Sequence, residues 1–136
     1  MTYHHLVMEN YTIFTKKVFE HLTGRKLTSG QPKVLEYLFT HDGAVQKEIA
    51  EACLIEPATV TSLLYRMEKQ GLIIRQINKE NRRYWNVYLT EQGKEEAEYV
   101  NDIFREMEAE ALNGFSKEET DMLLSYLRRI HKNLEA

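Results

Sequence analysis

The sequence predicts a mainly α-helical fold with one small β-hairpin, and three features of its 136 residues predict it. Apolar residues recur at spacings of three and four over most of the chain, which is the period of an amphipathic helix. Two short helical segments, QKEIAEAC and PATVTSLLYRMEKQG, are separated by only three residues, so the chain must turn a corner between them. Two strand-like segments, LIIRQI and YWNVYLT, then flank the polar tip NKENRR.

The N-terminal part is predicted to form two helices. The first spans about residues 3–23 and is ended by Gly24. The second starts near Ser29, tolerates Pro32 in its first turn and ends at His41-Asp42-Gly43. The first carries one apolar stripe of Val7, Tyr11, Phe14, Val18 and Leu22, and the second carries Val34, Leu35, Leu38 and Phe39, which are expected to face inward.

The helix that opens at Pro57 separates into two faces. Its buried stripe is expected to be Val60, Leu63, Leu64 and Met67, whereas Ala58, Thr61, Ser62, Tyr65 and Lys69 fall on the opposite side. The hairpin that follows carries Lys79, Arg82 and Arg83 at its tip, against the single acid Glu80. Such a helix fits a major groove of duplex DNA, and such a tip suits the phosphate backbone or a narrow minor groove. The chain from Gln46 to Thr90 is therefore predicted to be a winged helix-turn-helix.

Two further helices are predicted after the hairpin. Thr90 is a good N-cap for a long charged helix, which Asn113-Gly114 stops. Ser116 and Glu119 form a capping box at the start of the last helix. The expected inward face of the long helix is Val100, Ile103, Phe104, Met107 and Ala111. The last helix carries Leu123, Leu127, Ile130 and Leu134 on one stripe.

The terminal helices carry more apolar surface than a winged helix-turn-helix over about residues 28–90 can bury. A two-fold dimer is expected to cover it, because a dimer also presents two recognition helices to successive turns of one groove. Helices over about residues 3–23 and 91–134 would then be dimerisation helices within a single domain, 1–136. The residues expected at this interface are Val7, Tyr11, Phe14, Leu123, Leu127, Ile130 and Leu134. An intramolecular lid is the alternative.

Composition excludes several classes of protein. Hydrophobic residues make up 43% and charged residues 29%, which is ordinary for one globular domain and argues against disorder. The longest apolar run, Ala52 to Ile55, is far too short to span a membrane, and no secretion signal is expected. The single cysteine, Cys53, favours a reducing cytoplasm and is expected to be an inert buried thiol. No catalytic arrangement, cofactor motif or metal-ligand spacing is present, so neither an enzyme nor a cofactor is expected.

The net charge of −3 is distributed unevenly along the chain. Residues 66–83 contain six basic and two acidic side chains, a local charge of +4. Residues 94–121 contain three basic and ten acidic side chains, a local charge of −7. Because local field rather than total charge sets attraction to phosphate, an acidic protein of this kind is compatible with DNA binding.

The order of four helices, a hairpin and two more helices resembles the MarR family of bacterial transcription regulators over nearly the whole chain. LTSGQPKVLEYL is similar to the family's second helix, and KEIAEACLIEPATVTSLLYRMEKQGLI to its helix-turn-helix. NRRYWNVYLTEQG resembles the wing signature of the family, which is the most specific of the three. The resemblance implies a ligand-responsive dimeric repressor, with a small-molecule effector bound between the dimer helices and the DNA-binding lobe.

The chain departs from the family pattern in four places. Asn81 replaces the aspartate that begins the wing signature, so a pairing with Arg83 is lost and the rigidity of the wing is in question. Leu54 occupies a turn position where glycine is common, which would cost about 1 kcal/mol if the backbone there has positive φ. Glu56 stands at the N-cap of the recognition helix, where serine is usual. Ser62 stands where arginine often reads guanine, so an A·T-rich, pseudo-palindromic operator is the hypothesis.

These observations predict a sequence-specific regulator that binds double-stranded DNA as a homodimer. The residues expected to contact DNA are Gln46, Pro57, Ala58, Thr59, Thr61, Ser62, Tyr65, Lys69, Lys79, Arg82 and Arg83. Two alternatives stay open: a winged-helix protein-interaction module that does not bind DNA, and a metal-responsive regulator of the same fold.

Overall fold

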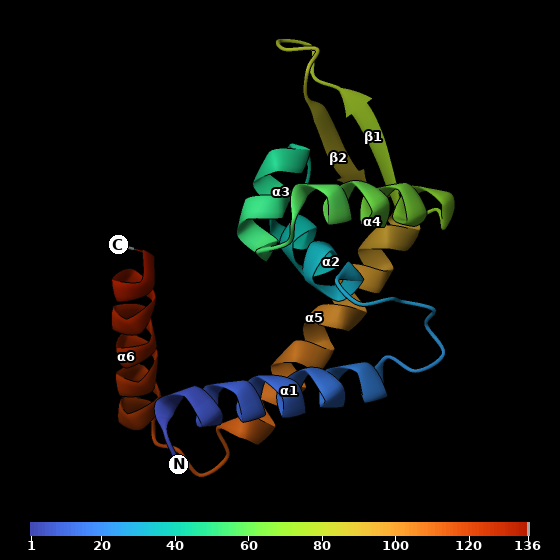
Figure 1. The fold of residues 1–136 in the computed structure, drawn as a ribbon. Helices are drawn as coiled ribbons and strands as arrows, with labels where there is room; N and C mark the ends of the chain where they lie inside the picture. Colours follow the sequence, from blue (N-terminus) through green and yellow to red (C-terminus); the bar gives the residue numbers. More distant parts are fainter. Residues whose placement is uncertain (136) are drawn as a thin grey trace. The chain divides into compact units, whose positions relative to one another are not determined.

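The computed structural model describes residues 1–135, and its elements follow the predicted order (Figure 1). They are α1 (Tyr3–His21), α2 (Gln31–Thr40), α3 (Gln46–Cys53), α4 (Pro57–Lys69), β1 (Ile73–Ile77), β2 (Trp85–Leu89), α5 (Glu91–Ala111) and α6 (Lys117–Glu135). The strands pair antiparallel, with Ile73 opposite Leu89 and Ile77 opposite Trp85. The predicted fold class, mainly α with a small β-hairpin wing, is confirmed.

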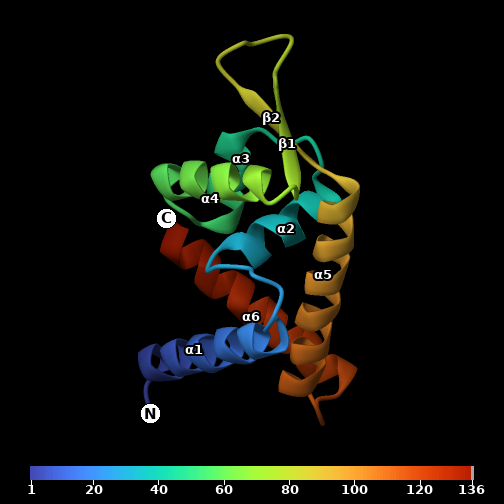
Figure 2. The same ribbon diagram turned by 90° about the vertical axis from the view of Figure 1, so that its right-hand side faces the viewer.

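The chain divides into two compact units, one ending at Phe104 and the other beginning at Arg105. In the first unit, α2, α3 and α4 lie together, and the β1–β2 hairpin projects away from them (Figures 1 and 2). Helix α1 lies at the end of this unit remote from the hairpin. The tip of the hairpin therefore extends beyond the helix-turn-helix.

The core of the first unit is built from α2, α3, α4, the inner face of the hairpin and the first part of α5. The side chains that are at most 1% exposed include Val34, Leu35, Leu38, Ile49, Val60, Leu64, Met67, Ile73, Val87 and Val100. The predicted buried stripe of α4 is confirmed, since Leu63 is also buried. The prediction for Phe39 was wrong: its side chain is 40% exposed. Phe39 lies in the last turn of α2 at the edge of the apolar stripe, where the core no longer covers it.

The start of α2 differs slightly from the prediction because a buried amide organises the preceding turn. Gly30 adopts a left-handed conformation, with φ at 91°, so the helix begins at Gln31 rather than near Ser29. The Gln31 side chain is fully buried; it accepts a hydrogen bond from the Thr28 backbone N–H and donates one to Gln70 Oε1, both of 3.0 Å. Gln70 in turn donates to the Lys26 carbonyl at 3.1 Å. This chain of amides joins the start of α2 to the end of α4.

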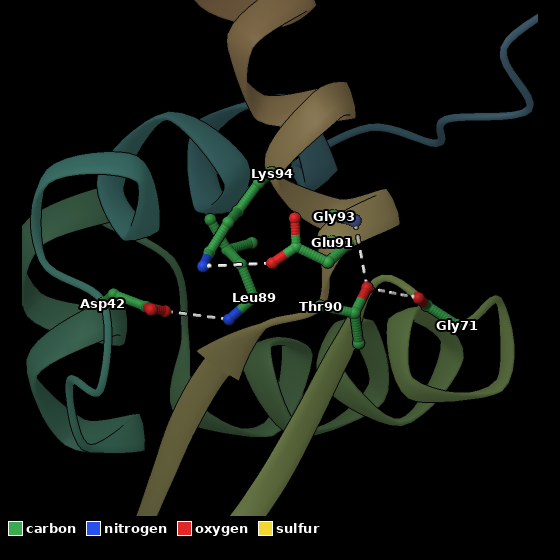
Figure 3. Close-up of polar contacts among 7 residues, drawn as sticks. All are labelled: Asp42, Gly71, Leu89, Thr90, Glu91, Gly93 and Lys94. Carbon is green, nitrogen blue, oxygen red and sulfur yellow. Dashed lines mark hydrogen bonds and ion pairs between the residues drawn. The ribbon is translucent and has the colours of Figure 1, made fainter.

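Thr90 joins the end of the recognition helix region to the start of α5 (Figure 3). Its hydroxyl donates to the Gly71 carbonyl at 2.6 Å and accepts from the Gly93 backbone N–H at 3.0 Å, which confirms the predicted N-cap. A Cβ at Gly93 would overlap the Leu72 carbonyl oxygen, so only glycine allows this approach of α5 to the hairpin. On the other side of the joint, Asp42 accepts from the Leu89 backbone N–H at 2.8 Å. The Leu-Thr-x-x-Gly segment thus fixes where the hairpin ends and α5 begins.

The second unit contains the end of α5 and helix α6. Its predicted capping box is present, because Ser116 N–H donates to Glu119 Oε1 at 2.9 Å and Glu119 N–H donates to Ser116 Oγ at 3.1 Å. Ala111 is exposed, so its prediction as an inward residue was wrong; it is the last residue of its helix. No described residue of α6 is buried. Over residues 1–135, none of the helices has the length and apolar content needed to cross a membrane.

Candidate nucleic-acid interface

The corner between α3 and α4 sets the direction of the recognition helix. Leu54 ends α3 in a left-handed conformation, with φ at 54° and ψ at 47°, and its side chain is 82% exposed. The positive φ at this turn position is therefore present, and an apolar side chain is exposed there. Pro57 follows in the first turn of α4, where its missing N–H costs nothing. Glu56 is the N-cap, but its side chain makes no capping hydrogen bond.

The outer face of α4 is polar and exposed along its whole length. Ala58, Thr61, Ser62, Tyr65 and Lys69 are all exposed, opposite the buried stripe, as predicted. The Lys69 ammonium lies 4.7 Å from the centroid of the Tyr65 ring, so these two predicted contacts form one cation–π pair. Gln46, the first residue of α3, donates from Nε2 to Thr61 Oγ1 at 2.6 Å. Four of the predicted DNA contacts are thus joined in two pairs.

Thr59 lies apart from this group. By helical spacing it falls on the flank of α4 opposite Thr61, and it lines a cavity described below rather than the outer face. Its prediction as a DNA contact stays untested, and its position does not favour that role.

The tip of the hairpin is ordered by asparagine side chains that the sequence analysis had not assigned. Asn78 Oδ1 accepts from the backbone N–H groups of Glu80 and Asn81, both at 2.9 Å. Asn81 Oδ1 accepts from the Arg83 N–H at 3.1 Å. Asn81 therefore holds the Arg83 backbone although it cannot pair with its guanidinium. The signal in the sequence was the Asn-x-x-Asn spacing, because Asn side chains commonly bond backbone N–H groups two or three residues ahead.

The cationic side chains of the tip are available to a ligand. Lys79, Arg82 and Arg83 are exposed, and within residues 1–135 none of them forms an ion pair. Arg75, lower on the hairpin, differs from them: its Nη2 lies 3.0 Å from Glu68 Oε1, and its guanidinium lies 5.6 Å from the centroid of the Trp85 ring. Arg75 therefore links the hairpin to α4, while the tip residues carry free positive charge.

Strand β2 is hydrogen-bonded to the loop between α2 and α3. Asn86 Nδ2 donates to the Gly43 carbonyl at 2.8 Å, and its Oδ1 accepts from Asn78 Nδ2 at 3.0 Å. The backbone N–H of Gly43 donates to the Val87 carbonyl at 2.8 Å, and that of Val87 donates to the Ala44 carbonyl at 2.9 Å. These hydrogen bonds attach the wing to the helix-turn-helix along β2.

A cavity of about 1310 Å³ lies within the first unit, between α1, α2 and the start of α4. Tyr11, Phe14 and Phe19 of α1 line it. The lining also contains five other residues with ionisable side chains, which are Lys16, Lys33, Glu36, Tyr37 and Cys53. The Phe14 and Phe104 rings stack with centroids 6.3 Å apart. The wall is thus mostly aromatic and aliphatic, with a few charged groups.

Cys53 is a buried member of this lining. It is 7% exposed, and its Sγ donates to the Lys33 carbonyl at 3.6 Å. Burial raises the pKa of the Cys53 thiol; the Lys33 charge opposes this effect and Glu36 adds to it. Burial, with Glu48 and Cys53 as lesser causes, also raises the pKa of Tyr37. Among the described residues, no group of three or more His, Cys, Asp or Glu side chains is assembled that would hold a metal ion.

The residues predicted for dimerisation are placed on α1 and α6. Val7 and Tyr11 are 43% and 58% exposed, and Phe14 is half-buried. On α6, Leu127 and Leu134 are 47% and 75% exposed, and Leu123 and Ile130 are half-buried. Each helix therefore has an apolar face that its own unit leaves largely uncovered.

Comparison with known proteins identifies this architecture. The MarR family model matches residues 27–84, which run from the loop before α2 to the residue before β2. The structure of Staphylococcus aureus MepR in its DNA-binding conformation is similar over 98% of this chain and 99% of that one, with a TM-score of 0.91 and 30% identity. The chain belongs to the MarR family. This MarR-family member is also similar to MepR in its DNA complex, with a TM-score of 0.86 and the same identity and coverage.

A curated relative extends the comparison to sequence. The uncharacterized HTH-type transcriptional regulator YybA of Bacillus subtilis (strain 168) is 28% identical over 116 residues, which cover 80% of this MarR-family chain and 73% of YybA. The homologues and the fold are those of transcription regulators.

Proposed function

We propose that this MarR-family regulator binds double-stranded DNA in a sequence-specific manner, with α4 in the major groove and the hairpin tip on the phosphate backbone or in the minor groove. The observation that carries the proposal is the exposed positive charge on a hairpin tip that hydrogen bonds hold in order. Lys79, Arg82 and Arg83 are exposed cations without ion-pair partners in the described chain, on a tip ordered by Asn78 and Asn81. The solved complex of MepR with DNA supports it, because MepR has the same fold.

The outer face of α4 determines what kind of operator this protein would read. Ala58 and the Thr61 methyl suit contacts with thymine methyl groups, and Ser62 has no reach for bidentate guanine recognition. We infer an A·T-rich operator, in which Arg83 enters a narrow minor groove. Glu56 places a negative charge at the start of α4, which lowers affinity for the phosphates there.

We propose that the regulator acts as a homodimer. The apolar faces of α1 and α6, which include Val7, Tyr11, Leu127 and Leu134, are exposed within their own units. Exposed apolar faces of this kind on helices outside the DNA-binding elements are typical of subunit interfaces. A two-fold dimer would present two copies of α4 to one duplex and would require a pseudo-palindromic operator.

We also propose that the protein is a repressor whose DNA affinity falls when a small molecule occupies the cavity beside α4. The cavity touches Thr59 and Leu63 of α4 and the residues that precede it, so an occupant would contact the recognition helix directly. Its aromatic lining suits an apolar or aromatic molecule. A compound found to release DNA should lose its effect in Thr15→Phe, which fills the cavity, and keep it in Thr23→Phe, which lies outside the lining.

The experiment that tests DNA binding is selection of random duplexes by the purified protein, followed by affinity measurements over a range of salt concentrations. Enriched palindromes with half-site centres about ten base pairs apart would support both DNA binding and the dimer. Affinity should fall log-linearly with salt, and Arg82→Ala should lower the slope by about one, whereas Lys117→Ala on α6 should leave it unchanged. A protein-interaction module would give no enriched sequence and no steep salt dependence. G·C-rich half-sites would overturn the inferred operator.

A further inference from the structure

The hydroxyl group of Thr61 is already engaged on the outer face of α4. Thr61 Oγ1 donates its only proton to the Pro57 carbonyl, one helical turn earlier, at 3.0 Å. The same oxygen accepts a hydrogen bond from Gln46 Nε2 of α3 at 2.6 Å. Because a hydroxyl group has a single proton, Thr61 has no donor left for a base edge.

This arrangement also orients both side chains. Since the Thr61 proton goes to Pro57, the group 2.6 Å away from Oγ1 must be the NH₂ of Gln46, which fixes the orientation of that amide. A threonine in a helix normally divides between two rotamers. The bond from Gln46 favours the rotamer with the hydroxyl turned back onto the helix, so that the methyl is the uncommitted end of an exposed side chain.

We propose that Gln46 is the positioning residue that makes Thr61 a reader of thymine methyl groups rather than a hydrogen-bond donor to base edges. The inference rests on the DNA binding proposed above and assigns one specificity contact to it. Gln46 was predicted to contact DNA itself; in this assignment it acts through Thr61. Burying one methyl carbon against another is a small effect, about fourfold in affinity, but it is specific to thymine.

Thr59 provides a matched control on the same helix. It is also an exposed threonine, but it lies on the opposite flank of α4 and lines the cavity. In the part of the chain that the structure describes, its hydroxyl has neither the Gln46 bond nor an equivalent one. Removal of the Thr59 methyl therefore deletes the same group as removal of the Thr61 methyl, but it leaves the proposed contact between Thr61 and thymine unchanged.

The experiment measures dissociation constants of the full chain on the selected operator, with deoxyuridine replacing one thymidine at a time. Deoxyuridine pairs in the same way but lacks the C5 methyl group. The wild-type protein should bind about fourfold more weakly when one particular thymine of each half-site is replaced. Thr61→Ser, which keeps the hydroxyl and removes the methyl, should lose this preference, whereas Thr59→Ser should keep it.

The role of Gln46 is tested by a double-mutant cycle on the thymine-to-uracil ratio, which is the affinity for the thymine operator divided by the affinity for the uracil operator. Gln46→Ala should move the thymine-to-uracil ratio toward one, because the Thr61 hydroxyl is then free to turn outward. Thr61→Val keeps a methyl in the single rotamer that valine prefers in helices, so it should keep the preference, and adding Gln46→Ala to it should change nothing further. Circular dichroism of each variant checks that the helices are retained.

Three outcomes would overturn the proposal. If the wild-type protein binds its operator but no single thymine discriminates from uracil, Thr61 reads no methyl, and the proposed DNA-binding function stands without it. If Gln46→Ala leaves the ratio at the wild-type value, Gln46 does not position Thr61. If the wild-type protein enriches no duplex at all, the proposed function itself fails, and this inference fails with it.

Discussion

The joint at Thr90 offers a quantitative test of how the wing is fastened to α5. Thr90→Val preserves the size and branching of the side chain and removes only the hydroxyl. That hydroxyl makes two hydrogen bonds, to the Gly71 carbonyl at 2.6 Å and from the Gly93 N–H at 3.0 Å (Figure 3). The variant therefore removes both bonds and introduces no cavity.

The expected loss of stability follows from these two bonds. The loss of an N-cap bond typically costs about 1 kcal/mol. The loss of the bond to the part-buried Gly71 carbonyl costs about 1 kcal/mol more, because the carbonyl is left without that donor. We expect Thr90→Val to lower the free energy of unfolding by about 2 kcal/mol, which corresponds to a fall in Tm of about 7 °C for a chain of this size.

The assay is urea and thermal unfolding followed by circular dichroism at one fixed protein concentration, since oligomerisation makes both midpoints depend on concentration. Thr90→Ser is the matched control, because it keeps the hydroxyl and removes only the methyl. We expect it to lose less than about 1 kcal/mol. A loss below about 0.5 kcal/mol in Thr90→Val, or an equal loss in both variants, would refute the assignment of the joint to the hydroxyl.

Three further predictions follow from single side chains. Leu54→Gly should stabilise the protein by about 0.5 kcal/mol in urea unfolding, because relief of about 1–2 kcal/mol of left-handed strain exceeds the entropy that glycine adds to the unfolded chain. Leu54→Ala keeps the Cβ and should show no such gain. Arg83→Ala should weaken operator binding by about 1–3 kcal/mol in a fluorescence anisotropy titration, with unchanged circular dichroism, and equal affinity would exclude Arg83 from the interface. Because burial raises the pKa of the Cys53 thiol, the thiolate is scarce near neutral pH. Alkylation of the native protein should therefore be much slower than that of the urea-unfolded chain, and it should accelerate as pH rises. Fast alkylation at neutral pH, or loss of DNA affinity after peroxide treatment, would contradict an inert thiol.

Much of the fold could be predicted because its patterns are local. The spacing of Val60, Leu63, Leu64 and Met67 identified the buried face of α4, and Pro57 marked its start. The cap at Thr90 was likewise readable, because it depends on residues within one helical turn. Patterns of this range are written in consecutive residues, so they need no knowledge of what packs against them.

The burial of residues near the ends of helices was harder to predict, as Phe39 and Ala111 illustrate. Both continue an apolar stripe, and both are exposed near the end of a helix. Periodicity gives the direction in which a side chain faces, but it does not give the extent of the element that would cover it. That extent depends on neighbouring elements, which the pattern within one helix does not contain.

In the candidate interface, too, local features could be predicted from the sequence and long-range contacts could not. The sequence by itself determined which residues lie on the outer face of α4 and which cations sit at the hairpin tip, because helical period and turn composition are local properties. Only the tertiary structure decided that Gln46 holds Thr61, that Thr59 faces a cavity, and that Asn86 fastens the wing to the loop at Gly43. These relationships join residues 15 to 43 positions apart in the chain, and such distances are closed only when the core has packed.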